Sequence, residues 1–471
     1  MTDHTYDVIV IGAGPAGENA ADYAVQRGLS AVIVEKELVG GECSYWGCMP
    51  SKALLQGPEA LARAQRVPSA AAAITGTIDV DKVLATRDSF TSNWDDSGQV
   101  KWLDGAGIDL VRGHGRLAGE RVVEVEQADG TAVRLEATRA VVIAIGTRAA
   151  IPPIDGLRDI RTWDNRDITE TKEIPNRLLV LGGGVIGVEM AQIVKRLGAE
   201  TVEVLEAMDT ILGREEPEAA AHLTDRLRDE GIGIHVGSKV VNVTRQGTDG
   251  PVTATLEDGT SLEGDEILVA VGRSAPTSDL GLDTVGVEAG RGGFIDVDDH
   301  LRVPGQDWLH VVGDANGRAL LTHQGKYQAR LVGDHIAGID VDPAWADDRA
   351  LVRVVFTDPN IAAVGLTEAQ ARESGIDVLA VSYDMGHTAG GALQGKGYGG
   401  PAKLVIDRER RVVVGASFVA AGAGEMLHAA TIAIVSEITV DRLWHAVPAY
   451  PTASEVWLRL LEEVRKVDLA G

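Results

Sequence analysis

The chain has 471 residues, of which 70 are acidic and 44 are basic, and its formal net charge is −26. A surface with this much negative charge repels nucleic acid and anionic membranes, and we therefore expect neither as a partner. No stretch approaches the ~20 apolar residues of a membrane helix, and two cysteines are too few for a framework of structural disulfides. We therefore expect a cytoplasmic protein of about three domains at ~150 residues each.

The first motif is a glycine-rich turn, Gly12-Ala-Gly14-Pro-Ala-Gly17, which follows an apolar stretch at residues 8–11 and precedes a helical pattern from Glu18. Glycines at this spacing permit a tight turn and let a pyrophosphate sit at the helix amino terminus. The next apolar stretch, residues 31–34, ends in Glu35, which is placed to bind a ribose hydroxyl. This order of elements predicts a strand–turn–helix dinucleotide site.

The two cysteines, Cys43 and Cys48, lie five residues apart, shortly after this motif. A zinc site needs about four ligands, and neither another cysteine nor a nearby histidine supplies them, so we expect no metal. Their spacing beside a redox cofactor predicts a disulfide that opens and closes during turnover. Pro50 and Ser51 favour a helix start near Cys48, where the helix amino terminus lowers the pKa of a thiol.

A second glycine-rich turn, Gly182-Gly-Gly184-Val-Ile-Gly187, lies between an apolar stretch at residues 178–181 and a helical pattern from Val188. The following strand pattern, residues 201–205, ends in Glu206. A carboxylate there accepts a hydrogen bond from a 2′-hydroxyl and repels a 2′-phosphate, so NADH is favoured over NADPH. Two dinucleotide folds in one chain predict two redox cofactors, one fixed and one exchanging.

The ordered motifs resemble the flavoprotein disulfide reductases, the family of dihydrolipoamide dehydrogenase, glutathione reductase and mercuric reductase. The resemblance runs through nearly the whole chain and rests on further segments: a crossover strand ending in Gly146, a second crossover ending in Gly272 and Arg273, a second FAD motif with Gly313 and Asp314, and the opening of a dimerisation domain at residues 355–368. It implies a homodimer of an α/β chain with two Rossmann-like domains, which bind FAD and NAD(P), and a carboxyl-terminal α+β dimerisation domain.

The domain boundaries follow from the motifs. We expect the FAD-binding domain over residues 1–150 and 276–345, the NAD(P)-binding domain over 151–275 and the dimerisation domain over 346–471. In the last domain the apolar patterns predict strands at residues 351–356, 403–406 and 412–418 and helices at 425–435 and 455–466, and the glycines of residues 390–400 predict a flexible loop.

The resemblance also implies roles for single residues. Cys48 would lie against the flavin as a thiolate, and Cys43 would exchange with the substrate. Lys52 and Glu189 match a charged pair near the reactive nitrogen of the flavin, where a cation stabilises negative charge on the reduced ring. Asp314 would bind the flavin side chain.

The chain departs from the family near its carboxyl terminus. Thiol-reducing members carry His-Pro-Thr followed by a glutamate that orients the histidine, whereas this chain has Tyr450 in the histidine position and retains Glu455. An ordinary histidine titrates near ~6.5 and an ordinary tyrosine near ~10, so a tyrosine is a poor base at neutral pH. His445, five residues upstream, is the alternative base. The aromatic pair Tyr45–Trp46 between the cysteines either packs under the flavin or offers a platform to a flat acceptor such as a quinone.

Three functional interpretations remain open. The leading one is an FAD-dependent oxidoreductase, similar to dihydrolipoamide dehydrogenase, that passes electrons from NAD(P)H through the Cys43–Cys48 disulfide to a small acceptor. The second is a reductase of a low-molecular-weight disulfide with Tyr450 as the acid, or a diaphorase that reduces quinones. The third is a docking subunit of a larger complex without catalysis of its own.

Overall fold

The computed structural model describes residues 2–470, which form two compact units. Unit 1 takes in the residues up to Ser51, Ala85–Ala150 and Arg273–Asp347, and unit 2 takes in Lys52–Leu84, Ile151–Gly272 and the residues from Asp348 onward. Each unit combines helices with β-sheet, as expected for an α/β chain. The division into three domains stays a prediction.

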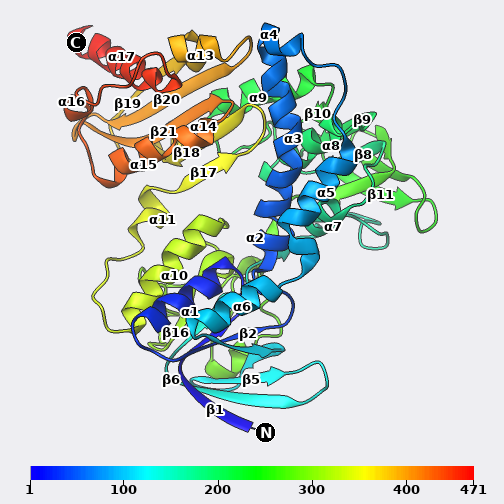
Figure 1. The fold of residues 1–471 in the computed structure, drawn as a ribbon, viewed down its shortest axis with the longest axis vertical. Helices are drawn as coiled ribbons and strands as arrows, with labels where there is room; N and C mark the ends of the chain where they lie inside the picture. Colours follow the sequence, from blue (N-terminus) through cyan, green and yellow to red (C-terminus); the bar gives the residue numbers. More distant parts are fainter. Residues whose placement is uncertain (1, 471) are drawn as a thin grey trace. The chain divides into compact units, whose positions relative to one another are not determined.

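Unit 1 is built on one mixed sheet that is buried on both faces. Its order is β3-β2-β1-β6-β5-β4, and β16 also pairs with β6. The strands are β1 (Thr2–Ile11), β2 (Ala31–Glu35), β3 (Asp109–Arg112), β4 (His114–Leu117), β5 (Val122–Glu126), β6 (Ala132–Ile143) and β16 (Leu309–Val311). The helices α1 (Pro15–Gln26), α6 (Ser97–Ala106) and α10 (Thr322–Ile336) cover one face (Figure 1).

The strand sequences explain this burial. Successive side chains of a strand point to opposite faces, and a parallel strand covered on both faces is apolar throughout. In β1, Val8 and Val10 pack in the core shared with α1 and α10, while Ile9 and Ile11 pack in the core on the other face. All four are almost fully buried. The sheet therefore fixes the turn that follows Ile11.

Unit 2 contains a parallel sheet, an antiparallel sheet and helices that cover them. The parallel sheet has the order β10-β9-β8-β14, and a three-stranded antiparallel sheet has the order β11-β12-β13. Their bounds are β8 (Arg177–Leu181), β9 (Thr201–Leu205), β10 (Gly233–His235), β11 (Val240–Arg245), β12 (Val252–Leu256), β13 (Ser261–Gly264) and β14 (Glu266–Val269). The helices α8 (Val185–Arg196) and α9 (Pro217–Asp229) belong to the same part of the chain.

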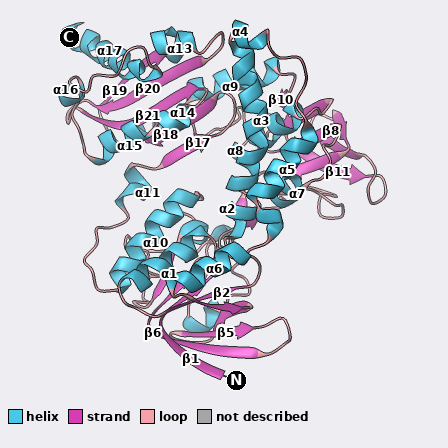
Figure 2. Cartoon of the chain, viewed as in Figure 1, coloured by secondary structure: helices cyan, strands magenta, loops and turns pink. Residues whose placement is uncertain are grey.

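The last part of unit 2 is a five-stranded antiparallel sheet with the order β17-β18-β21-β20-β19. The strands are β17 (Val352–Val355), β18 (Asn360–Gly365), β19 (Val378–Asp384), β20 (Gly399–Asp407) and β21 (Val412–Ala420). The helices α14 (Ala423–Met426), α15 (His428–Val435) and α17 (Val456–Ala470) lie against this sheet (Figure 2). The helix expected at residues 425–435 is thus two helices.

The flexible loop expected at residues 390–400 is wrong at both ends, and residues 394–398 form a short connection. Gly390 and Gly391 are buried in the helix α13 (Ala389–Leu393), and β20 begins at Gly399. A Cβ on Gly390 would lie 2.0 Å from the carbonyl carbon of Thr452. The glycine is needed for this close approach of two backbones, and it does not indicate mobility.

The part of the chain between Cys48 and Ala106 contains several helices, which are α3 (Cys48–Arg66), α4 (Pro68–Ala71), α5 (Val80–Phe90) and α6. Within residues 2–470, every helix is too short or too polar to cross a bilayer.

Three histidines of unit 1 lie in contact. The rings of His300 and His335 are stacked with centroids 5.6 Å apart, and the rings of His310 and His335 meet edge to face at 5.8 Å. Burial lowers the pKa of His310 to about 3 and also lowers the pKa of His335, and the charge of Arg302 adds to both effects. Burial therefore favours the neutral form of His310 and of His335 in the folded protein.

We predict that acid weakens the fold through His310. The folded-state pKa is about 3 and the ordinary value is 6.5, so only the unfolded chain binds a proton between these values. Stability is therefore lost as the pH falls below the unfolded value, by about 2 kcal/mol from this residue between about pH 8 and about pH 5. Denaturant unfolding at a series of pH values should show a flatter pH dependence for His310→Leu. The exposed His445→Leu variant should keep the slope of the wild type, and an unchanged slope in His310→Leu would contradict the prediction.

Candidate active site

The first glycine turn connects β1 to α1 and is held by an acidic side chain. Gly12 has a φ of +103° and a Cβ on Gly17 would lie 1.9 Å from the carbonyl oxygen of Gly12, so both positions require glycine. Glu35 Oε2 accepts a hydrogen bond from the backbone N–H of Ala13 at 2.7 Å. The space beside Gly14, where α1 begins, is open. The turn thus presents a helix amino terminus to open space, an arrangement suited to a pyrophosphate.

The second glycine turn, between β8 and α8, repeats this construction. Gly182 has a φ of +108°, and a Cβ on Gly187 would lie 2.0 Å from the carbonyl oxygen of Gly182. Glu206 Oε2 accepts from the N–H of Gly183 at 2.7 Å, and its Oε1 accepts from the N–H of Met208 at 2.8 Å. Gly184 again precedes the first helical residue. Unit 2 therefore carries a second turn that suits a dinucleotide.

The two cysteines lie close together in unit 1. Cys43 is in the helix α2 (Gly41–Tyr45), Cys48 begins α3, and both are half-buried free thiols. A hydrogen bond with Cys48, together with burial, raises the pKa of Cys43. The hydrogen bond and burial thus favour the protonated form of Cys43.

Thr322 is a member of the site that sequence reasoning missed. Its Oγ1 lies 3.2 Å from Cys48 Sγ, and its hydroxyl and the charge of Lys326 act to lower the pKa of Cys43. Thr322 is the first residue of α10. It lies 274 positions from Cys48 in sequence, so no local pattern connects the two.

Tyr45 and Trp46 between the cysteines are buried. They are 2% and 8% exposed, and their rings meet edge to face with centroids 5.7 Å apart. Burial also raises the pKa of Tyr45 to about 12. This arrangement matches the packing role, and buried rings offer no face to a flat acceptor.

In unit 1, Asp314 lies at the end of a series of side-chain hydrogen bonds. Thr147 Oγ1 donates to Asp314 Oδ2 at 2.7 Å, and Arg273 Nε donates to Thr147 Oγ1 at 2.7 Å. Burial raises the pKa of Asp314. Gly146, with a φ of +64°, and Gly313, with a φ of +70°, place the two backbones that carry Thr147 and Asp314. Arg273 follows Gly272 and bonds to Thr147, so its predicted contact with a cofactor stays a prediction.

Lys52 and Glu189 form an ion pair within unit 2. Lys52 Nζ lies 2.8 Å from Glu189 Oε2, and the glutamate is only 3% exposed. Phe356, which sequence reasoning did not assign to the site, contacts both members. Its N–H donates to Glu189 Oε1 at 2.8 Å, and its ring centroid lies 4.5 Å from Lys52 Nζ. The pair is thus fixed by a backbone hydrogen bond and a cation–π contact.

Tyr450 and Glu455 do not form the pair that the family pattern implies. Glu455 Oε2 accepts from the N–H of Ala389 at 3.1 Å, and its Oε1 accepts from Arg459 Nη2 at 2.6 Å. Both carboxylate oxygens are thus engaged by groups other than the Tyr450 hydroxyl. Tyr450 itself is 77% exposed, and the alternative base His445 is exposed as well. Across residues 2–470, no three His, Cys, Asp or Glu side chains are grouped to hold a metal ion.

Comparison with known proteins identifies the family. Residues 6–329 match the family described as pyridine nucleotide-disulphide oxidoreductase, and residues 351–460 match the dimerisation domain of that family. The chain therefore belongs to the pyridine nucleotide-disulphide oxidoreductases, which are enzymes that use FAD and NAD(P)H with a redox-active disulfide. The expected family and fold class are confirmed. The dimerisation domain supports a homodimer, and membership of a family of enzymes argues against a purely docking role.

Individual relatives cover almost the whole chain. Mercuric reductase of Streptomyces lividans is 34% identical over 99% of this chain and 98% of its own. Dihydrolipoyl dehydrogenase of Thermus scotoductus is 34% identical over 98% of both chains. The crystal structure of LpdA from Mycobacterium tuberculosis matches with a TM-score of 0.85 at 26% identity, over 98% of this chain and 100% of that one. The flavoprotein disulfide reductase RclA from Escherichia coli, 24% identical with a TM-score of 0.86 over 98% and 100%, shares the fold.

We predict that Thr322 eases deprotonation of the cysteine pair. Thr322→Val removes a hydrogen-bond donor from Cys48 and should raise the pH at which the reduced pair loses its first proton by about one unit. The measurement is the ultraviolet absorbance of the thiolate during a pH titration of the reduced protein. Thr322→Ser keeps the hydroxyl and serves as the matched control. A Thr322→Val curve that overlies that of the wild type would contradict the prediction.

Proposed function

We propose that this protein is a cytoplasmic FAD-dependent oxidoreductase, similar to dihydrolipoamide dehydrogenase, that takes electrons from NADH and passes them through a Cys43–Cys48 disulfide to a small acceptor. In the reductive half, NADH gives up a hydride and a proton comes from solvent, so that the sulfur–sulfur bond breaks and two thiols form. In the oxidative half, the acceptor takes two electrons and two protons from the thiols, and the sulfur–sulfur bond forms again.

The observation that carries this proposal is that Cys43 and Cys48 lie within hydrogen-bond reach of each other in unit 1. Thr322 Oγ1 lies 3.2 Å from Cys48 Sγ, so the two sulfurs have different surroundings. In the proposed cycle Cys43 faces the acceptor and Cys48 faces the flavin.

The residues present fit the two dinucleotides. The open turn at Gly14 with Glu35, and the buried Asp314, would hold the pyrophosphate, the ribose and the side chain of FAD. The turn at Gly184 with Glu206 would hold NADH. FAD, when bound, supplies the two-electron relay between the nicotinamide and the disulfide. Lys52, held by Glu189, would place a positive charge where the reduced ring is negative.

This chain offers only weak candidates for the acid and the base of thiol exchange. Glu455 is engaged by Ala389 and Arg459, and Tyr450 replaces the histidine of the family pattern. A tyrosine donates a proton more readily than it removes one near neutral pH. This favours an acceptor whose reduction needs no strong base at position 450 over rapid oxidation of dihydrolipoamide.

Anaerobic titration tests the proposal. One equivalent of NADH should produce two new thiols per FAD-loaded subunit together with a long-wavelength absorbance band, and NADPH should do so at higher concentration because Glu206 repels a 2′-phosphate. In Cys43→Ser the flavin should still be reduced, but no new pair of thiols should form. Flavin bleaching without new thiols in the wild type would contradict the proposal and would indicate a diaphorase that does not use the disulfide.

A second candidate is a reductase of a low-molecular-weight disulfide in which Tyr450 is the acid. The exposure of its side chain, at 77%, supports this role, since a substrate can reach the hydroxyl. We predict that Tyr450→Phe leaves turnover with a quinone acceptor unchanged.

Steady-state assays with lipoamide, glutathione disulfide and quinones separate the two candidates. If Tyr450→Phe lowers turnover with a thiol substrate by about a hundredfold, as loss of a general acid does, the second candidate is supported. A comparable loss with the quinone would contradict the prediction for the leading function.

A further inference from the structure

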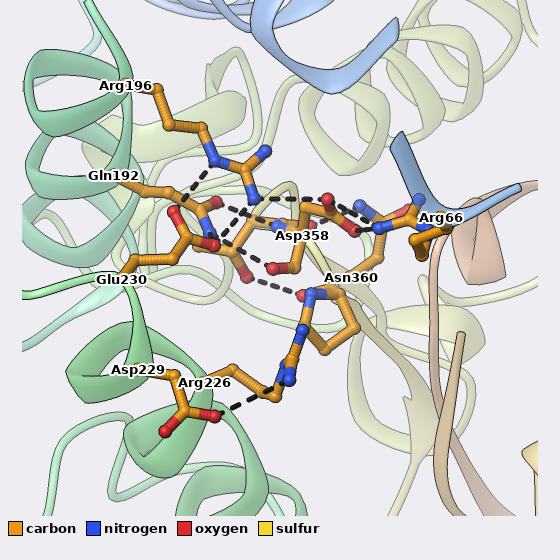
Figure 3. A network of polar contacts seen from close by, with 10 residues as sticks. Arg66, Gln192, Arg196, Arg226, Asp229, Glu230, Asp358 and Asn360 are labelled. Atoms are coloured by element: carbon orange, nitrogen blue, oxygen red, sulfur yellow. Dashed lines mark hydrogen bonds and ion pairs between the residues drawn. The ribbon is translucent and has the colours of Figure 1, made fainter. Parts of the chain in front are cut away.

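The segment that follows β17 is clamped onto α8 by a network of polar side chains (Figure 3). This segment contains Phe356 and Asp358 and leads into Asn360, the first residue of β18. Asn360 Nδ2 donates to the carbonyl oxygen of Thr357 and closes the turn on itself. The segment is the same one that supplies the Phe356 N–H to Glu189. Its position on α8 therefore determines whether the N–H of Phe356 reaches Glu189.

Gln192 pairs with the backbone of Asp358 in both directions. Its Oε1 accepts from the N–H of Asp358 at 2.8 Å, and its Nε2 donates to the carbonyl oxygen of Asp358 at 3.0 Å. Nε2 also donates to Glu230 Oε1 at 2.9 Å. Gln192 is fully buried. The side-chain amide of Gln192 thus satisfies both backbone polar groups of Asp358, as a neighbouring strand would. It fixes the position and the orientation of the two peptide groups.

The carboxylate of Asp358 lies between two arginines. Arg66 Nη1 lies 3.0 Å and 2.8 Å from its two oxygens, and Arg196 Nη2 lies 3.1 Å from one of them. Arg196 is held in turn by Glu230 at 2.6 Å and 2.8 Å. Asp358 is 5% exposed, so its charge is compensated by these partners and not by water. The segment is therefore fixed twice at Asp358: the two arginines hold its side-chain carboxylate, and Gln192 holds its backbone.

Glu189 and Gln192 are three residues apart on α8, and they therefore lie on one face of the helix. Glu189 binds Phe356, and Gln192 binds the residue two positions later. The segment is thus anchored at two consecutive points on that face. Phe356 cannot shift away from Glu189 or from Lys52 unless the Gln192 bonds also break.

We propose that Gln192 and Asp358 are positioning residues for the Lys52–Glu189 pair, and that they act through Phe356. The inference rests on the proposed function, in which the Lys52 cation stabilises the reduced flavin. Loss of the clamp frees Phe356 and withdraws its N–H from Glu189 and its ring from Lys52. The Lys52 side chain, which is 34% exposed, is then held by Glu189 alone and moves more freely. Neither Gln192 nor Asp358 is required to touch a substrate or a cofactor.

Amine labelling of the full-length protein tests this inference without depending on turnover. Lys52 and Lys403 are labelled with a limiting amine reagent, and the two peptides are quantified by mass spectrometry. Lys403 is the internal reference for general loosening of unit 2, because it is 8% exposed and is bound by Glu216, Glu218 and Glu368. In Gln192→Leu, Lys52 should be labelled about tenfold faster, as expected when a pair of buried hydrogen bonds is lost, and the labelling of Lys403 should not change.

The matched control is Asp229→Asn, which breaks the partly exposed ion pair between Asp229 and Arg226 (Figure 3) and touches neither Gln192 nor Asp358. It should leave the labelling of both lysines unchanged. If Gln192→Leu fails to fold, Asp358→Asn should still raise the labelling of Lys52 selectively. Labelling of Lys52 that equals the wild type, or that rises in step with Lys403, would overturn the inference.

The FAD-loaded variants supply a second readout. The midpoint potential of the flavin in Gln192→Leu should move to more negative values, since Lys52 would no longer be held in place by Phe356. An unchanged potential would overturn the inference. If the wild type gives no new thiols with NADH, the proposed function fails, and the labelling result still decides whether Gln192 positions Lys52.

Discussion

A buried carboxylate bound at both of its oxygens organises the candidate site of unit 2. Glu189 is 3% exposed, and Lys52 and the N–H of Phe356 bind its two oxygens. Removing one partner of a buried ion pair costs about 3–5 kcal/mol, because the other charge is left without compensation. The residues that satisfy Glu189 lie 137 and 167 positions away from it in sequence. Three distant segments must therefore pack together before the lysine has a fixed place.

The two dinucleotide turns could be predicted from the sequence because their determinants are local. A strand, a glycine turn, a helix and an acid at the end of the next strand follow one another within about 25 residues, and the steric need for glycine at Gly17 and Gly187 is visible in the backbone. The structure adds a role for the acids. Glu35 and Glu206 each accept from an N–H of their own turn, so they stabilise the turn in addition to the ribose contact that the motif predicts.

The remaining members of the site could not be predicted, because tertiary packing alone brings them in. Thr322 reaches Cys48, and Phe356 reaches Lys52, across long stretches of chain that carry no periodic signal. The error at Gly390 has the same origin. Glycine permits both flexible loops and close contacts between backbones, and only the position of Thr452 shows which one applies here. Cys43 and Cys48 could be found from their spacing, but the contact of Thr322 with Cys48 could not.

In the carboxyl-terminal segment, Glu455 makes bonds that differ from those of the family pattern. In the family pattern the glutamate orients a histidine, and its carboxylate would gain little from an exposed tyrosine hydroxyl. Here Glu455 instead binds the first N–H of α13 and the guanidinium of Arg459, one turn further along the chain. A carboxylate is favourable at a helix amino terminus and beside an arginine at i+4, so Glu455 now stabilises the fold of this segment. Glu455 thus occupies its place in the motif, but its hydrogen bonds stabilise the fold of this segment. A histidine introduced at position 450 would have to compete with Arg459 for the carboxylate of Glu455.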